Sequence, residues 1–159
     1  MSRTRLVLAD PLATEAVGRR LAGCVHGGMV IAVRGELGAG KTTLARGVLR
    51  GLGWQGPVKS PTYTLVEHYQ FSSLYFYHFD FYRVHDPGEW DSAGFAECFR
   101  DDSVCLVEWP ERVGDRLPVA DLDLALAHAS EAGRILDARA HGAAGLACLS
   151  ALARTGQAS

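Results

Sequence analysis

The stretch MVIAVRGELGAGKTT, Met29 to Thr43, decides the fold, because an apolar run leads directly into a glycine-rich loop. The run MVIAV predicts a buried strand, and the residues from Lys41 onward predict a helix with its apolar side chains on one face. Gly35, Gly40, Lys41 and Thr42 match the spacing GxxxxGK(S/T), which is typical of a phosphate-binding loop between a strand and a helix.

Each position in this loop has a chemical reason. Glycines let backbone N–H groups curl around phosphate oxygens, and the positive end of the next helix attracts negative charge. We expect Lys41 to reach the β- and γ-phosphates and Thr42 to bind Mg²⁺. The chain has 14 arginines but only two lysines, Lys41 and Lys59, and a compact ammonium suits a glycine loop better than a guanidinium. The loop residues expected at the nucleotide are Gly35, Glu36, Leu37, Gly38, Ala39, Gly40, Lys41 and Thr42.

The rest of the pattern predicts an α/β fold, a single three-layer P-loop NTPase domain with a mixed, mainly parallel central sheet and antiparallel hairpins. A chain of 159 residues fits one domain, so we assign residues 1–159 to it, with 152–159 as a loose tail. Besides the strand at 29–33, strands are expected at 5–9, 63–71, 74–80, 103–108, 121–129 and 134–140. Helices are expected at 11–25, from 41 to about 52, at 87–99, and as a short segment after 141.

The composition excludes several classes of protein. The chain is 48% hydrophobic and 21% charged, as in an ordinary globular protein. Its net charge of −2 gives no reason to expect a nucleic-acid surface, so any contact with RNA should run through a partner. We find no apolar run of the ~18 residues that a membrane span requires, and no signal peptide, and we expect a cytoplasmic protein.

Two carboxylates follow apolar strands, Asp80 after LYFYHF and Glu108 after SVCLV. Phosphoryl-transfer sites of this type place an acidic residue at a strand end, in contact with the metal directly or through water. Since VCLVE is the more uniformly apolar run, we assign Glu108 to Mg²⁺ and expect Asp80 to orient or deprotonate the attacking water. Either residue alone has a simpler interpretation, as a helix cap or an ion-pair partner of Arg83.

Other polar residues carry weaker signals. The segment KSPTYT, Lys59 to Thr64, has three hydroxyls in the first connection after the loop helix, either to sense a γ-phosphate or to form a serine-proline turn. His68, His78 and His85 have no metal-ligand spacing, and we interpret them as packing or surface residues.

Four motifs together resemble one known family. GELGAGKTT, VKSPTYTLVE, YHFDFYR and CLVEWPE, in this order and spacing, resemble the TsaE family of bacterial P-loop ATPases, which are required to form threonylcarbamoyladenosine at position 37 of tRNA. The resemblance covers residues 5–140. Two departures are mild: Glu36 stands where aspartate or asparagine is commoner, and Phe81 where leucine is usual.

The resemblance implies a slow ATPase that acts on a complex of TsaB and TsaD, with tRNA contacted only indirectly through that complex. It places Thr42 and Glu108 at the Mg²⁺ positions, Lys41 and Thr43 at the phosphates, and Asp80 at a position needed for turnover. The glycine-arginine pair that ends at Arg134 corresponds to a position flanking adenine. ATP and Mg²⁺ are the implied cofactors.

Three alternatives remain open at this point. A small-molecule P-loop kinase would need an arginine-rich lid, which the sequence lacks, and would transfer phosphate to an acceptor. A GTPase-like switch would need an asparagine to read guanine, and the chain has none; its DxxG at Asp91–Gly94 falls inside an expected helix. A nucleotide-binding interaction module would show no useful hydrolysis of its own.

Overall fold

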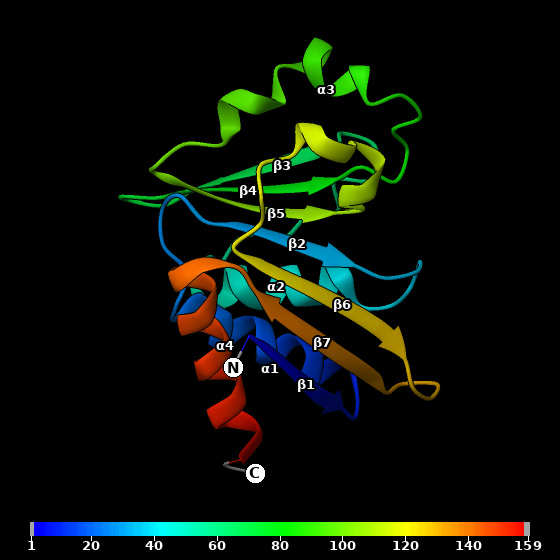
Figure 1. The fold of residues 1–159 in the computed structure, drawn as a ribbon, viewed down its shortest axis with the longest axis vertical. Helices are drawn as coiled ribbons and strands as arrows, with labels where there is room; N and C mark the ends of the chain where they lie inside the picture. Colours follow the sequence, from blue (N-terminus) through cyan, green and yellow to red (C-terminus); the bar gives the residue numbers. More distant parts are fainter. Residues whose placement is uncertain (1, 158–159) are drawn as a thin grey trace.

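One mixed sheet runs through the molecule in the order β1-β7-β6-β2-β5-β4-β3 (Figure 1). The structure is a computed structural model that describes residues 2–157. Its strands are β1 (Arg3–Leu8), β2 (Val30–Arg34), β3 (Val66–Gln70), β4 (Tyr75–Asp80), β5 (Ser103–Glu108), β6 (Leu122–His128) and β7 (Arg134–Ala140). The four central strands, β6, β2, β5 and β4, are parallel, whereas β3, β7 and β1 pair antiparallel toward the two edges. The predicted mixed sheet with two antiparallel hairpins is therefore confirmed.

The helices are α1 (Pro11–Ala22), α2 (Lys41–Gly51), α3 (Gly88–Ala93) and α4 (Gly142–Gln157), with short 3₁₀ turns at Phe95–Cys98, Pro110–Arg112 and Gly114–Arg116. α1 begins as the sequence predicts: the Asp10 carboxylate accepts a hydrogen bond from the Ala13 N–H at 2.9 Å, and proline takes the first helical position. Among the described residues, no helix combines the length and the apolar character needed to cross a membrane.

Several predicted boundaries are wrong, among them the end of the helix expected at 11–25, which lies at Ala22. The helix expected at 87–99 ends at Gly94, whose φ of 70° is left-handed and stops the α-helical hydrogen bonding, so a 3₁₀ turn follows α3. The strand expected at 63–71 begins only at Val66, after Leu65 with a φ of 67°. The loose tail is wrong for residues 152–157, because α4 continues to Gln157 and Leu152 is fully buried; residues 158–159 lie outside the described residues.

The alternation of side chains along the strands produces three layers. On β5, Val104 and Leu106 belong to the larger core, beneath α1, α2 and α4, whereas Cys105 and Val107 belong to a second core that includes Trp90 of α3. Figure 1 shows α3 beside β3, β4 and β5, at the end of the molecule away from α1 and α4. Every residue of β5 is buried, as expected for a central strand covered on both faces.

Glycines let α1 and α2 approach closely. A Cβ atom on Gly47 of α2 would lie 2.1 Å from the carbonyl oxygen of Glu15, and one on Gly18 of α1 would lie 2.3 Å from the carbonyl oxygen of Leu44. The two backbones are therefore in direct contact. Because α2 begins at Lys41, this contact also fixes the position of the loop that precedes it.

Candidate nucleotide-binding site

The predicted phosphate loop occupies residues 35–40, between the end of β2 and the start of α2. Its shape requires glycine at two points. Gly35 has a φ of 147°, and a Cβ atom there would lie 2.6 Å from the carbonyl oxygen of Leu126 on β6. Gly40 has a φ of 102° immediately before the first helical residue. Both positions lie in the backbone region that glycine adopts at little energetic cost.

The loop opens into a cavity of about 270 Å³ at the carboxyl ends of the central strands. The P-loop residues that line it are Leu37, Gly38, Gly40, Lys41, Thr42 and Thr43. Across from them lie Ser60 and Thr62 of the hydroxyl-rich segment, the strand-end carboxylates Asp80 and Glu108, and Trp109. Four motifs that are far apart in the sequence therefore meet in one cavity. Ligands bind at this edge of the sheet in open α/β folds.

Lys41 lies inside the curl of the loop. Its side chain is almost fully buried, and Nζ donates hydrogen bonds to the carbonyl oxygens of Gly35 at 2.6 Å and Glu36 at 2.8 Å. The ammonium also lies 4.7 Å from the centroid of the Trp109 ring, a cation–π distance. Burial lowers the pKa of Lys41, while the nearby Glu108 and Asp80 carboxylates oppose this shift.

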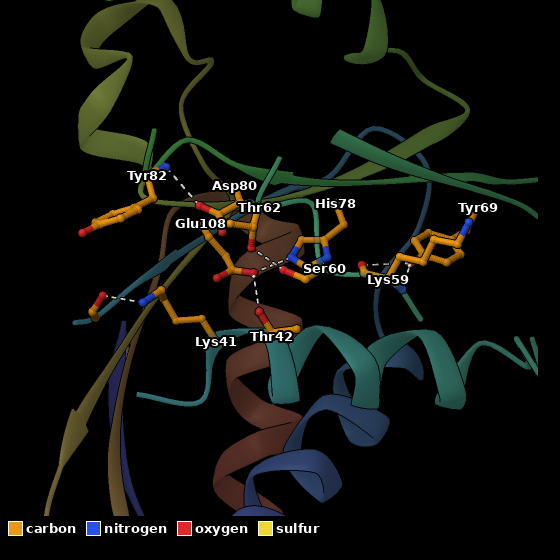
Figure 2. A network of polar contacts seen from close by, with 11 residues as sticks. Lys41, Thr42, Lys59, Ser60, Thr62, Tyr69, His78, Asp80, Tyr82 and Glu108 are labelled. Carbon is orange, nitrogen blue, oxygen red and sulfur yellow. Dashed lines mark hydrogen bonds and ion pairs between the residues drawn. The ribbon is translucent and has the colours of Figure 1, made fainter. Parts of the chain in front are cut away.

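Thr42 and Glu108 are in direct contact (Figure 2). The Thr42 hydroxyl donates to Glu108 Oε2 at 3.1 Å, which leaves the oxygen lone pairs of the threonine free to bind a cation. Asp80 on β4 pairs in register with Glu108 on β5, so the two carboxylates are neighbours at one sheet edge. Both are buried, Glu108 more completely than Asp80.

The donor set of this corner suits a hard cation. A threonine hydroxyl and one or two carboxylates offer only oxygen ligands, and Mg²⁺ is usually held by few side chains together with water and substrate phosphates. Residues 2–157 contain no group of three or more histidine, cysteine or acidic side chains that could hold a metal ion.

Asp80 is held by its own turn. Its Oδ1 accepts a hydrogen bond from the Tyr82 N–H at 3.0 Å. Burial raises the pKa of Asp80, and the adjacent Glu108 reinforces the shift, whereas the Tyr82 N–H, His78 and Lys41 oppose it. A carboxylate with a raised pKa beside a phosphate cavity is well suited to accept a proton from water.

We expect Asp80→Asn to raise the melting temperature at pH 7 by ~2 °C. The folded protein binds a proton at Asp80 more tightly than the unfolded chain, so ionised Asp80 lowers stability above both pKa values, and this penalty disappears as the pH falls below them. Asparagine keeps an acceptor for Tyr82 without the charge. Thermal denaturation at pH 7 and at pH 4 measures the difference, which should shrink in acid.

The control for this prediction is Asp101→Asn, at an exposed aspartate, which should shift the melting temperature by about 1 °C or less. A lower melting temperature for Asp80→Asn at pH 7 would contradict the prediction.

The hydroxyl-rich segment KSPTYT is an irregular loop bound to β3. The Ser60 and Thr62 hydroxyl oxygens are 2.6 Å apart and both line the cavity. The phenol of Tyr69 accepts the Lys59 backbone N–H at 3.0 Å, which fixes the start of the loop. Tyr63 points outward, 82% exposed, beneath the guanidinium of Arg83 at 4.5 Å.

Arg134 contacts the back of the phosphate loop. Its Nε donates to the carbonyl oxygen of Ala39 at 3.1 Å and its Nη2 to that of Gly38 at 3.0 Å. It lines a second cavity of about 240 Å³, on which Gly38, Gly40 and Thr43 also border. The arginine therefore holds the loop from behind, and its contact with adenine stays a prediction.

Two residues at the site were missed by the sequence analysis. His78 is buried and contacts the Glu108 carboxylate, in addition to packing in the sheet. The Trp109 ring covers Lys41, and the Trp109 backbone is left-handed, with a φ of 56°. The strand period offered a signal for the histidine, because His78 shares a sheet face with Asp80 two residues later. His68, in contrast, only stacks between Tyr75 and Tyr77.

Comparison with known proteins identifies the family. The model of the family described as threonylcarbamoyl adenosine biosynthesis protein TsaE matches residues 8–136. The chain belongs to the TsaE family.

Named TsaE proteins and a solved structure agree with this assignment. The TsaE protein of Haemophilus influenzae is 52% identical over 59% of this chain and 60% of its own length. The Bacillus subtilis TsaE protein is 35% identical over 82% of each chain. The crystal structure of Bacillus subtilis YdiB superposes with a TM-score of 0.82 at 29% identity, and the match covers 98% of this chain and 97% of that one. The TsaE family and its single α/β domain, both predicted from the sequence, are therefore confirmed.

Proposed function

We propose that this protein is a Mg²⁺-dependent ATPase that supports a complex of TsaB and TsaD in forming N6-threonylcarbamoyladenosine at position 37 of tRNA. The observation that carries the ATPase part is the contact of the Thr42 hydroxyl with Glu108 beside a buried lysine in a phosphate loop. The names of the related TsaE proteins support the tRNA part. We place this activity in the cytoplasm, with tRNA contacted only through the partner complex.

The residues of the cavity have distinct tasks in this proposal. Backbone N–H groups of residues 35–43 bind the phosphate oxygens of ATP, and Lys41 stabilises the charge on the β- and γ-phosphates. Thr42 and Glu108 are the residues that would hold Mg²⁺. When bound, the cation would neutralise negative charge on the phosphates. Asp80 accepts a proton from the attacking water or orients it, because it is the second carboxylate facing the same cavity.

Slow turnover by the isolated chain is expected. Within the described residues, the cavity walls contain no arginine that would stabilise the transferred phosphoryl group from the open side. An arginine supplied by a partner accelerates related phosphoryl transfers by ~10³–10⁵-fold. A partner that completes the site is therefore a physical route by which TsaB and TsaD would raise the rate.

Release of inorganic phosphate from Mg·ATP, with and without TsaB and TsaD, tests the proposal. We expect slow release by the chain alone, severalfold stimulation by the partners, and a loss of at least ~100-fold for Glu108→Ala. Glu97→Ala, which removes an exposed acid far from the cavity lining, is the matched control. Equal rates with and without partners would contradict the coupling. Phosphate transfer to a nucleoside, or preference for GTP, would support the kinase or GTPase alternative.

A further inference from the structure

His78 lies in a position that the proposed chemistry does not yet use. It is on β4, fully buried, and its Nε2 lies 2.5 Å from Glu108 Oε2 (Figure 2). The histidine comes two residues before Asp80, so both side chains extend from the same face of the strand toward the α2 side. At this distance the imidazole and the carboxylate are in direct contact.

The hydrogen bonding at Glu108 is asymmetric. Oε2 contacts both Nε2 of His78 and the Thr42 hydroxyl, one from β4 and one from the start of α2. Donors from two sides restrict rotation of the carboxylate group. With Oε2 occupied, Oε1 is the oxygen left for a cation or for one of its waters.

Nε2 is the ring nitrogen in contact with Glu108 Oε2, and we assign the hydrogen of this contact to Nε2 because a carboxylate oxygen is an acceptor. Within the part of the chain that the structure describes, Nδ1 is buried without a hydrogen-bond partner. Glu108 is therefore the hydrogen-bond partner of the His78 ring among the described residues.

We propose that His78 is a positioning residue that fixes the Glu108 carboxylate so that its Oε1 faces the Mg²⁺ site. This inference rests on the proposed function, because it assigns Glu108 to the metal. Outer residues that orient a metal-binding side chain change metal affinity by ~10–100-fold when they are replaced. The expected result of losing the N–H donor is therefore weaker Mg²⁺ binding with the nucleotide cavity otherwise intact.

The test compares variants that keep or remove the donor. His78→Gln retains an N–H group, whereas His78→Leu and His78→Phe remove it and differ in shape, so that at least one apolar replacement should fold. Phe76→Leu is the matched control, since Phe76 is buried on the same strand and the same face but belongs to the apolar core. Thermal denaturation of each full-length variant establishes that it is folded.

Calorimetric titration with a non-hydrolysable ATP analogue, over a series of Mg²⁺ concentrations, measures the half-saturating Mg²⁺ directly. We expect an increase of ~10-fold for His78→Leu and His78→Phe, with unchanged nucleotide affinity in EDTA. His78→Gln should remain within ~3-fold of wild type, and Phe76→Leu should lower the melting temperature without changing the Mg²⁺ dependence.

Three results would overturn this inference and leave the proposed function standing. The first is a wild-type Mg²⁺ dependence in both apolar variants, and the second is a loss of nucleotide affinity in EDTA as large as the loss in Mg²⁺. The third is a His78→Gln variant that binds Mg²⁺ as weakly as His78→Leu. Nucleotide binding by the wild type that did not depend on Mg²⁺ would overturn the proposed function together with it.

Discussion

Replacing Lys41 with alanine is expected to weaken ATP binding by ~100-fold and to abolish measurable hydrolysis. The ammonium is buried inside the loop and is the one lysine of the cavity lining in the described chain. Truncating one member of a buried, charge-assisted contact costs about 2–5 kcal/mol, and each 1.4 kcal/mol is about tenfold in affinity. Titration calorimetry for binding and phosphate release for turnover measure the two effects.

The chain has a natural control for this change, because its only other lysine is exposed at the start of the hydroxyl-rich loop. Lys59→Ala should bind ATP within ~2-fold of wild type, since surface changes seldom exceed ±0.5 kcal/mol. Lys41→Arg should fail like the alanine variant, because a planar guanidinium does not fit where Nζ lies between two carbonyl oxygens 2.6 and 2.8 Å away. Normal ATP affinity in Lys41→Ala would rule out this cavity as the phosphate site.

Gly47→Ala should lower the free energy of unfolding by ~3 kcal/mol. Alanine usually stabilises a helix interior by about 1 kcal/mol relative to glycine. The sign of the change therefore separates this helix propensity from a steric clash with α1. Here the added methyl would lie 2.1 Å from the Glu15 carbonyl oxygen and 3.0 Å from the Gly18 Cα, which are backbone atoms that cannot rotate away. α1 and α2 must therefore separate. Urea denaturation, with the slope checked for two-state behaviour, measures the loss.

Gly23→Ala is the matched control at the end of α1. Its φ of −74° suits any residue, and a Cβ atom there would lie 3.4 Å from the Arg20 carbonyl oxygen. We expect a change within about 0.5 kcal/mol. If Gly47→Ala were as stable as this control, the close contact of α1 with α2 would not be a determinant of stability.

The features that were predicted from the sequence are those determined by residues close to one another along the chain. The phosphate loop was predictable because its glycine, lysine and threonine positions are set by one local turn, and β5 because an uninterrupted apolar run ending in Glu108 suits a strand buried on both faces. The hairpin of β6 and β7 followed from two alternating runs, DLDLALAHA and RILDARA, on either side of a short turn. These features need no knowledge of distant contacts.

The remaining features depend on tertiary contacts. The helix after Asp86-Pro87 stops early because Gly94 adopts a left-handed conformation, which the apolar pattern does not encode. The end of the chain is helical because Leu152 packs in the main core, although its composition resembled a loose tail. The strand period places His78 on the same face as Asp80, but its contact with Glu108 was not predictable, since Glu108 is 30 residues away and on another strand.

The Arg134 guanidinium donates hydrogen bonds to the carbonyl oxygens of Gly38 and Ala39. These contacts limit how far the chain can be shortened without losing support for the loop. A truncated chain that ends after Glu108 would retain every phosphate and metal ligand proposed above, yet the loop would lose both β6 beside Gly35 and the arginine behind it. A fragment that keeps these contacts with the loop therefore extends to Arg134 of β7, and a truncation point chosen from the motifs alone would fall too early.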